Sequence, residues 1–189
     1  MLLHSRYFLP ALTSHRPDDG LQSFGNLVQN YDLACERFER GHPSSDKVEF
    51  AKTQITKAVS LCESPIEREM VPWLVLADLG EIASAPHRVF SSAEEFDLKL
   101  HLFIVPQFEL VSRRVDFAIV ASFKGRRRIF AFECDGLGYH NRRLDIVRDG
   151  ELAECGILTI RAWGAEIKKS PSAVCSRVQN VILTYMDEE

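Results

Sequence analysis

Two carboxylates and an imidazole fall within one short segment of this chain. The segment FECDGLGYH, residues 132–140, ends an apolar run typical of a strand and contains Glu133, Asp135 and His140. Residues two apart on a strand point to the same side, so we expect both carboxylates on one face. Like charges held together are costly unless a positive group lies between them. The segment therefore indicates a site that needs a positive partner.

A third carboxylate, Asp116, lies in VDFAIV on the preceding strand-like segment. The short link KGRRR between the two segments predicts an antiparallel hairpin. Side chains on one face of such a pair approach within about 5 to 8 Å, so Asp116 and Glu133 could meet. Both are embedded in apolar sequence, where a bare carboxylate is costly. A hard divalent cation would remove that cost, and Mg²⁺, or Mn²⁺ in its place, keeps positions open for water and phosphate.

Helices and strands are expected to alternate around these residues. Apolar spacing and start signals predict helices over residues 21–38, 45–61, 64–80, 141–155 and 170–186. Strand-like runs cover residues 99–110, 113–123, 127–135 and 156–164. The strand–helix–strand unit over 128–162 predicts a parallel crossover. The expected fold is α/β, with a central mixed β-sheet flanked by helices.

The helix over 64–80 has a clear start. Ser64 can be the N-cap, Pro65 fits the first helical position, and Glu67 completes a capping box. Pro72 is expected to kink or split the helix, and Gly80 is expected to end it.

The 189 residues suffice for one domain with a core of its own. We expect an N-terminal helical extension over residues 1–60 and the α/β domain over residues 61–189. The extension contains no readable motif, and it could form a homodimer or recruit a partner protein.

The formal net charge of −4 disfavours a nucleic-acid binder, but the charge is uneven along the chain. The basic residues gather in two stretches: Arg113, Arg114, Lys124, Arg126, Arg127 and Arg128, then Arg142, Arg143 and Arg148. A local basic surface is compatible with a phosphate backbone. The alternative is that KGRRR is only a solvated hairpin turn.

Five cysteines without a CxxC or CxxH pairing argue against a disulfide framework and against a zinc knuckle. Cys134 lies between the two strand carboxylates, so its side chain should point the other way, into the core. No apolar run approaches the roughly 18 residues of a membrane span. The first residues have no basic region or cleavage site typical of a signal peptide, so we expect a cytoplasmic location.

The order of these pieces resembles the PD-(D/E)XK nuclease superfamily, and most closely its branch related to the very-short-patch repair endonuclease. The resemblance covers about residues 62–165. Its pieces are SPIE with Glu67, the segment Arg114–Ile119 with Asp116, then Glu133, Asp135, Gly136, His140, Asp145, Arg148, Asp149, Leu152, Gly156 and Arg161. It implies a restriction-endonuclease-like core and a Mg²⁺-dependent endonuclease that hydrolyses phosphodiester bonds of DNA.

The resemblance also implies roles for single residues. Asp116 would bind the metal, Glu133 would be a second ligand or hold a metal-bound water, and the Cys134 carbonyl could contribute. Asp135 replaces the usual lysine and could bind metal or orient His140.

His140 would transfer a proton or contact the phosphate, and Arg148 would stabilise the developing charge. Glu67 matches the helix glutamate of the branch. The residues expected to contact nucleic acid are Arg114, Lys124, Arg126, Arg127, Arg128, Arg142 and Arg143.

Each assignment has a structural alternative. Glu67 could only close a capping box, and Asp116 could pair with Arg114 or Arg128. Glu133 and Asp135 could flank a solvated turn.

His140 could be a helix-entry residue, and Arg148 could form surface ion pairs. The missing lysine also keeps open a catalytically inactive, nuclease-like fold that binds nucleic acid or a protein partner. A hydrolase of small phosphate esters is a third option, which the basic stretches weigh against.

Overall fold

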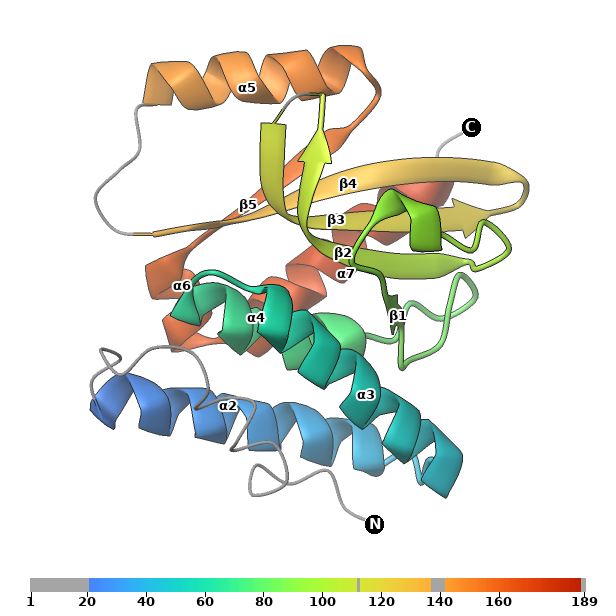
Figure 1. Ribbon diagram of the computed structural model, residues 1–189, viewed down its shortest axis with the longest axis vertical. Coiled ribbons are helices and arrows are strands. Elements are labelled where there is room, and N and C mark those ends of the chain that lie inside the picture. Colours follow the sequence, from blue (N-terminus) through green and yellow to red (C-terminus); the bar gives the residue numbers. More distant parts are fainter. Residues whose placement is uncertain (1–20, 112, 137–141, 188–189) are drawn as a thin grey trace.

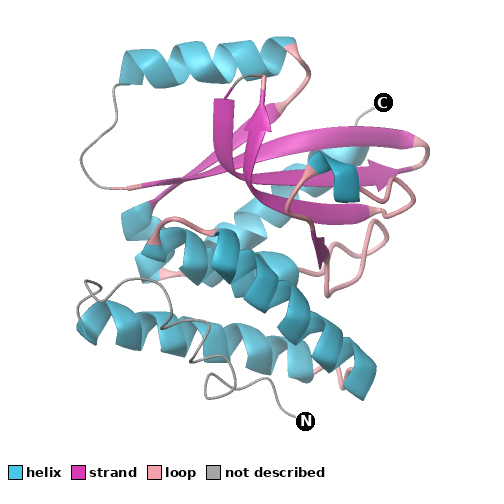
Figure 2. Cartoon of the chain, viewed as in Figure 1, coloured by secondary structure: helices cyan, strands magenta, loops and turns pink. Residues whose placement is uncertain are grey.

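The protein folds around a five-stranded mixed β-sheet with helices on both of its faces (Figures 1 and 2). The computed structural model describes residues 21–111, 113–136 and 142–187, with the side chains of 21–27, 142–145 and 148 left out of that description. The expected α/β class is confirmed.

The strands follow one another across the sheet in chain order, β1-β2-β3-β4-β5. Their bounds are β1 Arg88–Val89, β2 Leu102–Leu110, β3 Arg113–Phe123, β4 Arg126–Asp135 and β5 Leu158–Trp163. The three central strands are antiparallel, as the short turns between them require, whereas β1 and β5 pair in parallel at the two edges. The predicted β3–β4 hairpin and the parallel β4–β5 crossover are both confirmed.

Helix α5 covers one face of the sheet, and the remaining α-helices lie on the other side (Figure 1). The helical elements are α2 Leu21–Glu39, α3 Ser45–Leu61, α4 Pro65–Val75, the 3₁₀ turn η1 Ala93–Glu95, α5 Arg142–Glu154, α6 Gly164–Lys169 and α7 Pro171–Asp187. The alternation of side chains along β3 and β4 divides the apolar residues between these two layers. Phe117 and Phe132 enter the larger core, whereas Ala118 and Ala131 enter a smaller core with Leu152 of α5.

Cys134 is buried in the larger core, on the side of the strand opposite to the two carboxylates, as the alternation predicted. Burial raises the pKa of its thiol well above the ordinary value. All five cysteines are free thiols, so no disulfide contributes to this fold.

Helix α4 begins as predicted and ends earlier than predicted. The Ser64 hydroxyl caps it by accepting a hydrogen bond of 3.2 Å from the Glu67 amide, and Pro65 occupies the first turn. Pro72 lies inside the helix, which continues for less than one further turn, to Val75 rather than residue 80. Pro72 has no amide hydrogen and its ring crowds the preceding turn, which weakens the helix at this point.

Three short elements were not predicted. They are β1, η1 and α6, which have two, three and six residues. Elements of this length show too few residues for a helical or strand period to be recognised.

The N-terminal helices share the core of the sheet domain. Tyr31 and Cys35 of α2 and Ile55 of α3 belong to the same buried cluster as Met70 of α4 and Phe130 of β4. The part of the expected extension that the structure describes is therefore packed against the sheet domain, and the boundary at residue 60 stays a prediction. Among the described helices, none has both the length and the apolar character to cross a membrane.

His87 provides a test of this core. Its side chain is 3% exposed, and Nε2 lies 2.6 Å from the Ala77 carbonyl oxygen, which fixes a neutral ring with its proton on Nε2. Burial lowers the pKa of His87 from 6.5 to about 4. The unfolded chain therefore binds a proton between pH 6.5 and 4 that the folded chain does not, and stability falls as the pH is lowered through this window.

We expect this histidine to account for a loss of roughly 3 kcal/mol between pH 7 and pH 4. Urea unfolding of wild type and His87→Gln across this range measures it, and the variant should show a flatter pH dependence. His101→Gln is the matched control because His101 is exposed. Equal slopes in all three proteins would contradict the assignment.

Candidate functional site

Four carboxylates gather where β3 begins and β4 ends. The paired ladder of these strands stops at Phe117 and Phe132, one residue before Asp116 and Glu133 would face each other. Beyond that point β4 remains paired with β5, up to Asp135 opposite Trp163. The hairpin register thus brings Asp116 and Glu133 together at the same end of the sheet.

Asp116 is fixed by the backbone of the neighbouring strand. Its Oδ2 accepts a hydrogen bond of 2.7 Å from the amide of Cys134. Burial raises the pKa of Asp116 to about 7, the Glu133 charge adds to the effect, and the Cys134 amide opposes it. Glu67 and Asp135 raise it further by smaller amounts. Without a cation, this carboxyl is therefore close to half protonated at neutral pH.

Glu67 reaches the same site from α4. Its Oε2 accepts hydrogen bonds from the Glu63 amide at 2.9 Å and from Gln107 Nε2 at 2.8 Å. The capping alternative is therefore true in part, because the Ser64 cap and the carboxylate of Glu67 both serve the start of α4. The carboxylate also lies close enough to Asp116 to raise the pKa of that residue.

Gln107 is a site residue that sequence reasoning missed. It lies on β2 between the pairs Pro106–Phe117 and Phe108–Val115, which places it opposite Asp116. Its backbone has a φ of 52°, in the left-handed region that residues other than glycine rarely adopt. The only signal for it in the sequence is the Pro106–Gln107 interruption of an apolar strand.

Asp135 has a positive partner from the chain itself. Arg161 on β5 donates from Nη1 to Asp135 Oδ1 at 2.9 Å, and its Nε and Nη2 bind both carboxylate oxygens of Asp149 at 3.1 and 2.9 Å. Asp135 is only 7% exposed, so this ion pair compensates a buried charge. Arg161 belonged to the family pattern, but its pairing with Asp135 was not foreseen.

Two predicted catalytic residues cannot be placed. His140 lies outside the described residues, and Arg148 lies in α5 with a side chain that is not described. Arg142 and Arg143 begin α5, and their side chains are likewise not described.

The other predicted nucleic-acid contacts lie at two different places. Arg114 lies near the start of β3, close to Asp116. It is exposed, and its Nη2 lies 2.8 Å from Glu63 Oε2. The KGRRR turn lies at the opposite end of the hairpin, seven residues of β4 from the carboxylates, which is about 23 Å of strand.

Two residues of that turn have defined partners. Arg127 donates to Ser122 Oγ and to the Leu98 carbonyl, and Lys124 lies over the Phe123 ring with Nζ 4.0 Å from Asp187. The turn is therefore a basic surface separate from the carboxylates.

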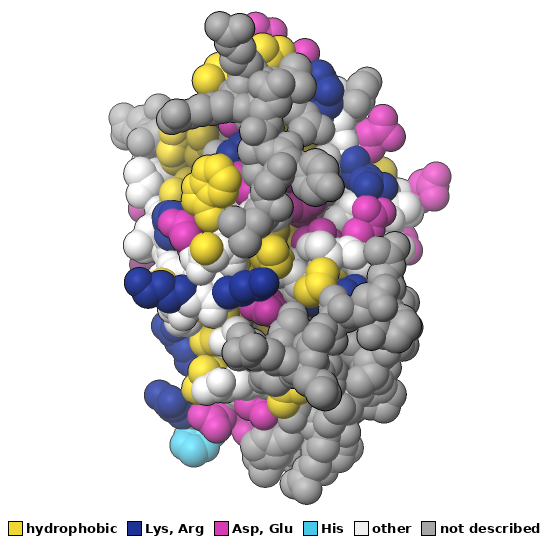
Figure 3. All heavy atoms as spheres, turned by 90° about the vertical axis from the view of Figure 1, so that its left-hand side faces the viewer, with side chains coloured by type: hydrophobic (Ala, Val, Ile, Leu, Met, Phe, Trp, Pro, Cys, Tyr) yellow, Lys and Arg dark blue, Asp and Glu magenta, His cyan; other side chains and the backbone are white. Residues whose placement is uncertain are grey.

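The side of the molecule where β4 and β5 end is mixed in charge. Figure 3 shows this side with acidic and basic side chains of the described residues interspersed.

The donor set at Asp116 fits a hard cation only in part. Within the described residues, no group of three or more His, Cys, Asp or Glu side chains is arranged to hold a metal ion. Asp116 and Glu133 supply two carboxylates, and burial followed by the Glu133 charge raises the pKa of Asp116. Glu67 and Asp135 are held by hydrogen bonds of their own. The residues present therefore fit an ion such as Mg²⁺ that is held by two carboxylates and keeps its waters.

Comparisons of the chain with protein-family models, with curated proteins and with solved structures gave no match.

The raised pKa of Asp116 makes a prediction about stability. The folded chain holds a proton on this carboxyl up to about pH 7, whereas the unfolded chain releases it near pH 3.8. The stabilisation is thus complete below pH 3.8 and is lost as the pH rises through 7. Asp116→Asn keeps an acceptor for the Cys134 amide and has no charge, so we expect it to be more stable than wild type at pH 8 by about 1–3 kcal/mol.

Urea unfolding in EDTA at pH 8 and pH 4 measures this difference, which should shrink at the lower pH. Asp97→Asn is the matched control because Asp97 is exposed, and it should change stability little at either pH. An Asp116→Asn protein that is less stable than wild type at pH 8 would contradict the raised pKa of Asp116.

The Asp135–Arg161 pair makes a separate prediction. Removing the guanidinium leaves a buried carboxylate without its partner, so Arg161→Gln should lose about 3 kcal/mol of unfolding free energy. Adding Asp135→Asn should recover part of that loss, with a coupling energy of about 1–3 kcal/mol in a double-mutant cycle.

The same cycle on Glu63 and Arg114 is the control, because both side chains of that pair are 58% exposed. Its coupling should stay below about 1 kcal/mol. Equal coupling in the two pairs would show that burial of Asp135 has no special consequence.

Proposed function

We propose that this protein is a Mg²⁺-dependent endonuclease that hydrolyses phosphodiester bonds of DNA on a restriction-endonuclease-like core. One observation carries the proposal. Asp116 is held beside Glu133 at the end of the central strands, and burial together with the Glu133 charge raises its pKa to about 7. A buried carboxylate with a raised pKa reduces the stability of the fold at neutral pH. A bound cation would stabilise its charged form, which gives such a carboxylate a function.

In this proposal Asp116, Glu133 and the Cys134 carbonyl hold the metal, and Mn²⁺ can replace Mg²⁺. The ion polarises the phosphate and lowers the pKa of the attacking water. The chain's own residues set the geometry. The Cys134 amide orients the Asp116 carboxylate, and Gln107 holds Glu67 at the edge of the site.

The role of Asp135 in this proposal is not metal binding. Its pairing with Arg161 makes it a positioning residue rather than a metal ligand. His140 and Arg148 keep the roles that the resemblance implies, proton transfer and stabilisation of the phosphate charge.

The basic residues would contact the DNA at two points. Arg114, Arg142 and Arg143 belong to the elements beside the carboxylates. Lys124 lies in the hairpin turn, and Arg126, Arg127 and Arg128 begin β4 next to it. A span of about 23 Å along the strands corresponds to roughly seven base pairs at 3.4 Å each. The turn would therefore bind phosphates well away from the cleaved bond.

A second function is favoured by the Asp135–Arg161 pair. The position that carries a lysine in the superfamily here carries an acid, and the nearby guanidinium is engaged by two carboxylates. A chain without a free cation at this position could bind nucleic acid or a protein partner without cleaving it.

A plasmid-nicking assay separates these functions. Wild type should nick supercoiled DNA with Mg²⁺ or Mn²⁺ and be inactive in EDTA. Asp116→Asn and Glu133→Gln should each reduce the rate at least about 100-fold, because each removes an ionised ligand of the metal. Asp97→Asn and Glu94→Gln, which change exposed acids of the same types, should keep wild-type activity.

Nicking that survives both site substitutions would reject the site. If no cleavage of DNA or RNA occurs while a gel-shift assay in EDTA detects binding, the binding function replaces the enzymatic one. The absence of both cleavage and binding would reject both functions.

A further inference from the structure

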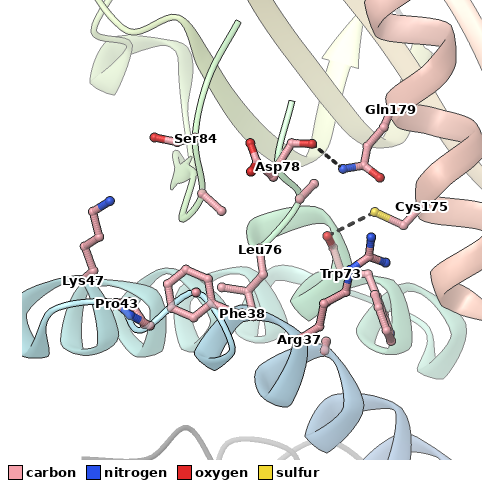
Figure 4. A pocket seen from close by; sticks show the side chains of 14 residues that line it. Arg37, Phe38, Pro43, Lys47, Trp73, Leu76, Asp78, Ser84, Cys175 and Gln179 are labelled. Carbon is pink, nitrogen blue, oxygen red and sulfur yellow. Dashed lines mark hydrogen bonds between the residues drawn. The ribbon is translucent and has the colours of Figure 1, made fainter. Parts of the chain in front are cut away.

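A cavity of about 390 Å³ lies on the helical side of the molecule, and none of the four site carboxylates lines it (Figure 4). It is bounded by the end of α2, the turn into α3, the C-terminal end of α4 with the segment after it, and α7. Its volume falls within the range of about 300–1,000 Å³ that is usual for sites of small organic ligands.

The middle of this cavity is apolar. Phe38, Leu76 and Trp73 line it, and Figure 4 shows the Phe38 ring between the two ends. Trp73 is only 7% exposed, and its Nε1 makes no hydrogen bond to any described residue. A buried indole N–H without an acceptor is uncommon and calls for an explanation.

Most of the polar groups in the wall already have partners. Gln179 Nε2 donates to the Asp78 carbonyl oxygen at 2.6 Å, and the Cys175 thiol donates to the Trp73 carbonyl oxygen at 3.2 Å. Asp78 Oδ1 accepts from the Gly80 amide at 3.0 Å. These groups form part of the wall, and their hydrogen bonds are made within the protein.

The two cations of the wall are different. Arg37 and Lys47 make no salt bridge with any residue that the structure describes, and Figure 4 shows them at opposite ends of the cavity. Arg37 is exposed and lies close enough to the buried Cys175 thiol for its charge to lower the pKa of that thiol, against the larger effect of burial. With Asp78 as the one acidic residue of the lining, the lining carries a net charge of +1 (two cations, one anion).

We propose that this cavity binds a small organic anion, with a carboxylate or phosphate group at Arg37 and an apolar ring against Phe38 and Leu76. A guanidinium matches the planar geometry of both anionic groups. The Lys47 ammonium at the other end binds a second anionic substituent, where the ligand has one. The proposal does not depend on the nuclease function, because the two sites share no residue.

Intrinsic fluorescence tests the site directly. The chain has two tryptophans, so Trp163→Phe leaves Trp73 in the cavity wall as the only one. In this background, phenyl phosphate or benzoate should produce a saturable change in Trp73 emission. Benzyl alcohol, which has the ring without the charge, should bind at least about fivefold more weakly, the effect of losing about 1 kcal/mol.

Arg37→Ala in the same background should weaken binding of both anions at least about fivefold. Lys47→Ala should change their affinity less, because each probe carries one anionic group, which the proposal places at Arg37. Arg40→Ala is the matched control, since Arg40 lies one turn on and does not line the cavity. Tighter binding of phenyl phosphate than of benzoate assigns a phosphate ligand, and the reverse order assigns a carboxylate.

Three results would overturn the proposal. They are the absence of a saturable change with either anion, equal binding of benzyl alcohol, and equal affinity in the Arg37→Ala and Arg40→Ala proteins. Thermal unfolding of each variant verifies its fold. If Arg37→Ala is unfolded, Arg37→Gln decides in its place, because Arg37 is exposed and glutamine keeps a long polar side chain without the charge.

Discussion

The burial of the Asp116 carboxylate beside other carboxylates at one end of the sheet is the constraint on which the candidate site depends. Glu67, Asp116, Glu133 and Asp135 come from α4, β3 and β4, and the charges of the other three add to the cost of ionising Asp116. The chain compensates two of them itself, with Gln107 and the Glu63 amide for Glu67 and with Arg161 for Asp135. Asp116 keeps a pKa raised to about 7 by its burial and by the Glu133 charge, and this raised pKa is the strongest indication of function in the described residues.

The same strands can hold both a core and a charged site because successive side chains point to opposite faces of the sheet. Phe132 and Cys134 point into the larger core, whereas Glu133 and Asp135 point toward the face covered by α5. The packed face fixes β4 in position, so the carboxylates on the other face are held without any contact of their own to the core. Where the β3–β4 ladder stops, the Cys134 amide has no ladder partner on β3 and binds the Asp116 carboxylate.

Much of the fold could be predicted from the sequence, because the long elements carry strong local signals. The bounds of α3 and β3 agree with prediction, since α3 has a Ser44 cap and helical spacing and β3 contains the apolar run Phe117–Ala121. The errors occur where a signal is short or weak. Helix α4 ends at Val75 because Pro72 weakens it. Helix α6 was not predicted, because its six residues are too few to show a helical period.

The sequence by itself determined which residues can carry charge on one face of a strand, because the period of two follows from backbone geometry alone. That was sufficient to select Asp116, Glu133 and Asp135 as a group. Only the tertiary structure decided which partners these carboxylates meet. Arg161 meets Asp135 through the parallel pairing of β4 and β5, and Gln107 meets Glu67 because β2 passes α4. Such contacts join segments 26 and 40 residues apart, and no local pattern in the sequence encodes them.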